Sequence, residues 1–298
     1  MMTDLNRLLG RQNFKNAKEL QAFLDNLKDT SLYDLPKMEL TPEEQAQDLV
    51  YEASELMPSK AKKNIEKALE LDPNCIEAYE YLASRERKME KAMEFLEKGI
   101  AIGRKKFGGK FLKEHKGDFW GFHETRPFMT CLYSKAEILI IEGKTAEGVA
   151  IMEELLELNK NDNQGVRFPL LSALITLGET KKFKKYDKMF ADDQHSAQLL
   201  YPRALFAFKT EGDSANARKL LKKAFEKNPF VVQKMGNPNY KLTSPAHYTF
   251  GSPEEADEYM IYGFIPWAKT EGAMEWLAVT IGNLLEKSGM ERIVKTIK

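Results

Sequence analysis

The stretch that decides the fold is residues 217–229, which read ARKLLKKAFEKNP. Ala217 and Ala224 lie two helical turns apart on one face, with apolar Leu221 between them. Pro229 ends the helix because proline cannot continue its hydrogen-bond pattern. The same arrangement recurs at Ala61, Ile65, Ala68 and Pro73. The spacing therefore predicts the second helix of a helical repeat, whose neighbours approach closely at the small residues.

This frame recurs along the chain at a nearly constant interval. Its leading residues are Ala61, Ala92, Gly148, Lys182 and Ala217. Most intervals are close to roughly 34 residues, a period typical of paired helices. The interval from Ala92 to Gly148 is longer by about 22 residues, which predicts an insertion at about 103–126. The frame at Lys182 fits poorly because a small residue is usual there.

The pattern predicts an all-α chain in three parts. No stretch alternates Val, Ile or Thr between turn residues, so no strand is expected. Residues 1–40 are interpreted as an N-terminal arm or capping helix, with a helix at 16–27. Thr41-Pro42-Glu43-Glu44 is typical of a helix start, and a repeat array is expected over 41–229. Residues 230–298 are expected to form a loop and two capping helices, at 252–264 and 272–285.

Composition restricts the class of protein. The chain has 45 Lys and Arg residues and 45 Asp and Glu residues. It therefore lacks the net positive charge that favours general binding to nucleic acid. No apolar run approaches the roughly 18 residues that span a bilayer, and the first residues do not read as a secretory signal. A cytoplasmic protein is expected. Its two cysteines, Cys75 and Cys131, are predicted to be buried, reduced thiols.

Ala61-Ala68-Pro73 and Ala217-Ala224-Pro229 resemble the tetratricopeptide repeat. Further likeness lies in residues 46–53, 117–121, 124–129, 161–167 and 272–277, which resemble uncharacterised bacterial repeat proteins related to the suppressor-of-tumorigenicity family. The resemblance implies a right-handed superhelix, an α-solenoid of about five helical hairpins with capping helices at both ends. It implies no catalytic activity and no cofactor. Lys160 and Lys182 depart from the usual repeat pattern.

The predicted insertion contains the densest group of polar and aromatic side chains. Its candidate residues are Trp120, His123, Glu124 and Arg126. Histidine with carboxylate can bind a metal or transfer protons, so a metal-dependent or acid/base enzyme built on His123 and Glu124 is one alternative. No ligand spacing of the HExxH kind is present. Filling of a gap between repeats by aromatic residues is the favoured interpretation, and no metal site is predicted.

Two further motifs are interpreted structurally. Residues 161–167 read NDNQGVR and lack the terminal acid of a calcium loop, so a helix cap at Asp162 or Asn163 is favoured. Residues 181–188 read KKFKKYDK, a basic run with aromatics that would allow weak nucleic-acid binding. Because the aromatics and the lysines fall on opposite helical faces, a solvated face is the favoured interpretation.

The first helix of each pair in such an array lines the concave face. The frame places seven side chains there: Val50, Tyr133, Glu137, Arg167, Leu171, Phe206 and Lys209. Aromatic anchors flanked by charges suit a peptide or a partner helix. The sequence therefore predicts a non-catalytic scaffold that binds a protein partner in its concave groove. The partner and the oligomeric state are left open.

Overall fold

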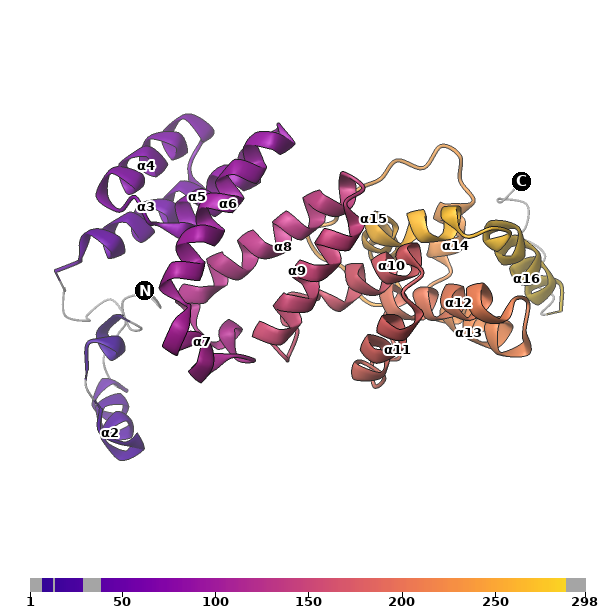
Figure 1. The fold of residues 1–298 in the computed structure, drawn as a ribbon, viewed down its shortest axis with the longest axis horizontal. Coiled ribbons are helices and arrows are strands. Elements are labelled where there is room, and N and C mark those ends of the chain that lie inside the picture. The colour runs from indigo at the N-terminus through magenta and orange to yellow at the C-terminus, as the bar shows by residue number, and fades with distance from the viewer. Residues whose placement is uncertain (1–6, 13, 29–38, 288–298) are drawn as a thin grey trace. The chain divides into compact units, whose positions relative to one another are not determined.

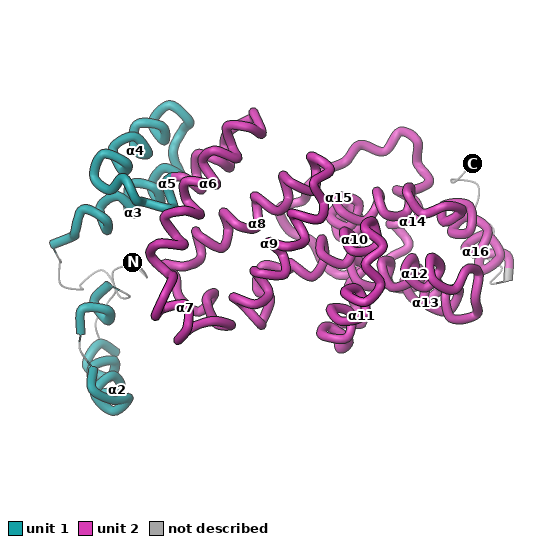
Figure 2. Tube along the Cα trace, in the orientation of Figure 1, with its two compact units in different colours: residues 1–78 teal, residues 79–298 magenta. Residues whose placement is uncertain are grey.

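The computed structural model describes residues 7–12, 14–28 and 39–287. These residues form helices and loops, and the only β interactions among them are isolated bridges of Gly117 and Asp118 with Asn159. The all-α prediction is confirmed for the described residues (Figure 1). The chain divides into two compact units, residues 1–78 (unit 1) and residues 79–298 (unit 2), shown in Figure 2.

Unit 1 contains a helical hairpin and a separate helix. Helix α2 (Ala17–Leu27) begins at the cap Asn16, as the sequence predicts. Helix α3 (Pro42–Glu55) begins at the predicted capping box, in which Thr41 and Glu44 each accept from the other's backbone N–H. It packs against α4 (Pro58–Leu71) through the buried repeat positions of the two helices, which are Ala46, Val50, Ala53, Ala61, Ile65 and Ala68.

Unit 2 is built on three hairpins of consecutive helices. Helix α8 (Arg126–Ile141) packs with α9 (Thr145–Leu158), α10 (Arg167–Leu177) with α11 (Thr180–Met189), and α12 (Ala197–Glu211) with α13 (Ala215–Lys227). The repeat positions Ala217, Leu221 and Ala224 are fully buried, as their spacing predicts. Paired adjacent helices are therefore present in both units.

The residues of the predicted insertion, about 103–126, form the end of one helix, a short helix and two 3₁₀ turns. After α5 (Ile76–Arg85), helix α6 (Met89–Lys106) runs through Gly103 and packs against α8. A Cβ at Gly103 would lie 2.2 Å from Cδ2 of Phe128, so only glycine permits this approach. The short helix α7 (Gly109–His115) and the 3₁₀ turns η2 (Phe119–Gly121) and η3 (His123–Thr125) follow.

Rings from the insertion fill the space beside α6 and α8. Phe119 is buried, and its ring lies 6.4 Å from Phe107 and 5.5 Å from Phe111. The ring of His115 lies 4.6 Å from those of both Phe111 and Phe122. These contacts agree with the gap-filling interpretation of the insertion.

The chain then folds back onto the hairpins of unit 2. The expected loop after Pro229 contains a short helix, α14 (Phe230–Met235), because Val231, Val232 and Met235 are buried. Helix α15 (Pro253–Lys269) is longer than predicted and packs against α10, α12 and α14 (Figure 1). Helix α16 (Ala273–Lys287) packs on α13, where a capping helix is expected. Helix α15 thus covers the first helices of two hairpins.

A buried carboxylate connects the start of α15 to two other helices by hydrogen bonds. Glu255 is fully buried and accepts from the backbone N–H groups of Ala197 (2.8 Å) and Gly251 (2.7 Å). It also accepts from the side-chain amide of Asn228 at 2.9 Å. One side chain therefore joins the beginning of α12, the end of α13 and the beginning of α15.

Candidate binding groove

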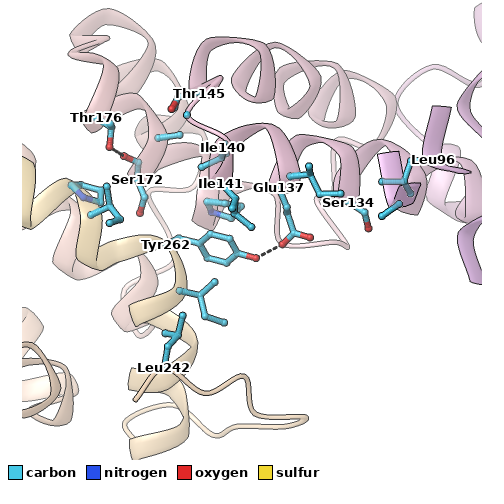
Figure 3. Close-up of a pocket in the computed structure, with 18 of the residues that line it drawn as sticks. Leu96, Ser134, Glu137, Ile140, Ile141, Thr145, Ser172, Thr176, Leu242 and Tyr262 are labelled. Carbon is cyan, nitrogen blue, oxygen red and sulfur yellow. Dashed lines mark hydrogen bonds between the residues drawn. The ribbon is translucent and has the colours of Figure 1, made fainter. Parts of the chain in front are cut away.

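A groove of about 720 Å³ opens in unit 2 between the hairpins and α15. Its walls come from α5, α6, α8, α10 and α15, and from the loop between α14 and α15 (Figure 3). The side chains that line it are mainly apolar. Representative lining residues are Ala83, Leu96, Ile138, Ile140, Pro169, Ala173, Ile261 and Pro266. The volume falls in the range of pockets that bind ligands in proteins.

Three large apolar side chains at the groove are exposed to solvent. Ile141 at the end of α8 is 66% exposed, Leu242 in the loop 61%, and Ile265 on α15 50%. They belong to three separate segments and all line the same groove, so we call them the apolar rim. Exposed apolar side chains gathered at a concave site mark surfaces that bind partners, whereas singly scattered ones do not.

A carboxylate and a tyrosine form the polar part of the groove. Tyr262 on α15 points toward Glu137 on α8, and its hydroxyl donates to Oε1 of that carboxylate (Figure 3). Burial raises the pKa of Glu137, and the hydrogen bond from Tyr262 partly opposes this rise. Burial also raises the pKa of Tyr262, so its hydroxyl remains a donor at neutral pH.

The preceding turn of each of these two helices adds a further polar residue to this part of the groove. Tyr133 lies one turn before Glu137 on α8, and Glu258 lies one turn before Tyr262 on α15. The charge of Glu258 raises the pKa of Glu137, and burial raises the pKa of Glu258 itself. Among the described residues, no lysine or arginine lowers the pKa of either carboxyl or forms an ion pair with it. We call these four residues the Tyr–Glu cluster.

The seven side chains predicted to line a concave groove differ in their surroundings within each unit. Glu137 lines the groove, and Tyr133 is beside it in the Tyr–Glu cluster. Val50 belongs to unit 1, where it is buried on α3, and Leu171 is fully buried on α10. Their apolar character reflects helix packing.

The remaining three predicted residues make contacts within unit 2. Arg167 forms an ion pair with Asp162 at 2.8 Å. The ring of Phe206 stacks on that of Phe183 at 3.9 Å. Lys209 donates to the carbonyl of Ile175 at 2.6 Å. The prediction that these side chains bind a partner stays untested, but their contacts show that each already serves the fold.

Sequence reasoning missed the apolar rim. Leu242 lies in a segment rich in Gly, Pro, Asn and Ser, where an apolar residue does not stand out. Ile265 lies on α15, which was expected only to cap the array. The pair Ile140-Ile141, placed directly before the turn at Gly143, gave no clear sign either, because single exposed apolar residues are common on protein surfaces.

The candidate residues of the insertion are engaged locally or exposed. The guanidinium of Arg126 lies 5.3 Å from the centre of the Trp120 ring, and its Nε donates to the Trp120 carbonyl at 3.0 Å. His123 and Glu124 are exposed. Within the described ranges, no group of three His, Cys, Asp or Glu side chains is placed to hold a metal ion.

The other motifs have structural roles. Asp162 accepts from the backbone N–H groups of Val166 (2.7 Å) and Arg167 (3.2 Å), as expected of a helix cap. On α11, Phe183 and Tyr186 are buried, while Lys182 pairs with Glu153. The two cysteines are buried and not bonded to each other, as predicted. No described helix has the length and apolarity needed to cross a bilayer.

Neither a protein-family model nor a curated protein matches this chain. The resemblance to tetratricopeptide proteins therefore stays a prediction.

Proposed function

We propose that unit 2 is a tetratricopeptide-like scaffold that binds a partner polypeptide in the groove and catalyses no reaction. The observation that carries this proposal is the convergence of the apolar rim on one cavity. A partner's apolar side chains would cover Ile141, Leu242 and Ile265, and covering each contributes roughly 1 to 2 kcal/mol to binding. Three such contacts at the centre of an interface are enough to form an energetic hot spot.

The architecture supports a polypeptide ligand. The groove is bounded by consecutive hairpins, and stacked hairpins offer extended surfaces on which a segment of chain can lie. The walls expose few hydrogen-bonding groups, so recognition would rest on side chains entering the cavity. By contrast, the enzyme hypothesis rests on His123 and Glu124, which are exposed, and the nucleic-acid hypothesis on the lysines of α11 alone.

Peptide display tests this proposal. The folded protein would be used to select from a random dodecapeptide library, in parallel with an Ile141→Glu/Ile265→Glu variant. We expect the wild-type protein to enrich apolar peptides, and the variant to lose at least tenfold in affinity because a carboxylate at the rim cannot be covered without desolvation.

A matched control separates the rim from general surface apolarity. Met189 on α11 is 47% exposed and does not line the groove, so Met189→Glu should leave the enrichment unchanged. Equal helical content and thermal midpoints would establish that the variants fold. Enrichment that survives the double rim substitution would refute the groove as the binding site.

A further inference from the structure

We infer that the partner segment carries a lysine or arginine whose cation binds Glu137, while its neighbouring apolar side chains cover the rim. This inference rests on the proposed function and specifies the partner's chemistry. It concerns a carboxylate that lies inside an otherwise apolar groove.

The geometry of Glu137 leaves one oxygen available. Oε1 accepts from Tyr262, and no described residue donates to Oε2. Glu137 is partly exposed and lines the groove. In Figure 3 the carboxylate extends beside the Tyr262 hydroxyl into that space. An incoming N–H donor can therefore reach it without displacing Tyr262.

The charge of the groove near this point favours a cation. Glu258 adds a second carboxylate to the Tyr–Glu cluster. The lining cation Lys269 lies two turns beyond Tyr262 on α15, about 10 Å along the helix axis. Among the described residues, no lysine or arginine affects the pKa of Glu137 or Glu258. A cation entering beside Glu137 is therefore attracted by two carboxylates.

The apolar walls select the kind of cation. Lysine and arginine carry their charge at the end of an apolar stem, which can pack along Ile138 or Ile140 while the charged group reaches Glu137. A metal ion requires several oxygen ligands, and the described residues provide no such group. The raised pKa of Glu137 agrees with a carboxylate that lacks a compensating charge in the free protein.

Three display libraries of random dodecapeptides, identical except for a central Lys, Met or Glu, test the inference. Methionine matches the length and apolar stem of lysine without its charge. We expect the wild-type protein to enrich the Lys library at least tenfold over the Met library, and the Glu library least of all. Glu137→Gln should abolish the preference for Lys over Met while retaining binding of both libraries.

Two further variants separate binding from positioning. Tyr262→Phe removes the hydrogen bond to Glu137 but keeps the carboxylate, so it should retain part of the preference for Lys that Glu137→Gln abolishes. Glu254→Gln changes an exposed carboxylate on the same helix and should also retain it. Equal enrichment of Lys and Met by the wild-type protein, or a Lys preference that survives Glu137→Gln, would overturn the inference. If the Ile141→Glu/Ile265→Glu variant enriches the same peptides as wild type, the proposed function is instead refuted.

Discussion

The hydroxyl of Tyr262 on α15 donates to the carboxylate of Glu137 on α8, joining residues 125 positions apart in the chain. The bond lies at the boundary between a hairpin helix and the helix that folds back over the hairpins. It therefore links the docking of α15 to the shape of the groove. Removing either partner should affect stability, and removing Glu137 should also abolish the preference for a cation.

The ionisation of Glu137 should make stability depend on pH. Burial raises its pKa in the folded protein, so the folded state binds the proton more tightly than the unfolded state does. The stabilisation from that proton is complete below the ordinary pKa of 4.5 and is lost as pH rises through the higher folded-state value. Glu137→Gln should therefore raise the thermal midpoint relative to wild type at pH 8 and much less at pH 4.

Thermal unfolding followed by circular dichroism over this pH range measures that difference. Glu254→Gln, on the exposed face of α15, provides the control and should show no such trend. If the difference in thermal midpoint between wild type and Glu137→Gln stays constant with pH, the prediction is contradicted. A constant difference would come from packing and not from ionisation.

Tyr262→Phe should destabilise unit 2 by about 2 kcal/mol, because hydrogen bonds to charged groups contribute more than neutral ones. The substitution should also raise the pKa of Glu137 further, since the Tyr262 hydroxyl favours its ionised form. Urea unfolding at pH 7 gives the stability, and carboxyl titration by NMR gives the pKa. In the Glu137→Gln background the same substitution should cost less, which a double-mutant cycle would reveal.

Glu255→Ala should be among the most destabilising single changes in unit 2. It leaves three N–H donors, from Ala197, Asn228 and Gly251, without their acceptor in the interior. A loss of about 3 kcal/mol or more is expected, because each unsatisfied buried donor costs roughly 1 to 3 kcal/mol. The neighbouring exposed Glu254→Ala is the control for denaturant unfolding and should change stability by about 0.5 kcal/mol or less.

Gly103→Ala should destabilise the contact between α6 and α8. Alanine favours a helix by up to about 1 kcal/mol over glycine, but its Cβ would lie 2.2 Å from Cδ2 and 2.9 Å from Cβ of Phe128. Since the clash reaches the base of the Phe128 side chain, rotation of the ring cannot relieve it. An overpacking cost of about 1 to 3 kcal/mol should outweigh that gain, and Phe128→Ala, which removes Cγ and Cδ2 but leaves Cβ, should offset part of it. Additive effects of the two substitutions would argue against this contact.

The helices and their buried faces could be predicted from the sequence because their determinants are local. Small residues seven positions apart, as at Ala61 and Ala68, define one helical face, and a capping residue such as Thr41 defines a helix start. Both kinds of feature were found where expected. The predicted boundaries of the array at residues 41 and 229 stay a prediction.

The binding groove could be predicted only in part because its walls come from distant segments. The repeat frame identifies which residues of α8 and α10 face inward, and it includes Glu137. It carries no information that α15 will lie against α10 and α12. Leu171 and Phe206 were expected to be available to a partner for that reason, yet Leu171 is buried and Phe206 stacks on Phe183.

The dependence of the groove on α15 has a consequence for biosynthesis. Ribosomes add roughly 5 to 20 residues per second, so α10 is complete on the order of 4 to 15 s before translation reaches α15. During that interval α10 lacks the helix α15 that later packs against it. The nascent chain therefore exposes an apolar surface to chaperones and to other growing chains. The time that translation takes between α13 and α15 determines how long this surface stays exposed.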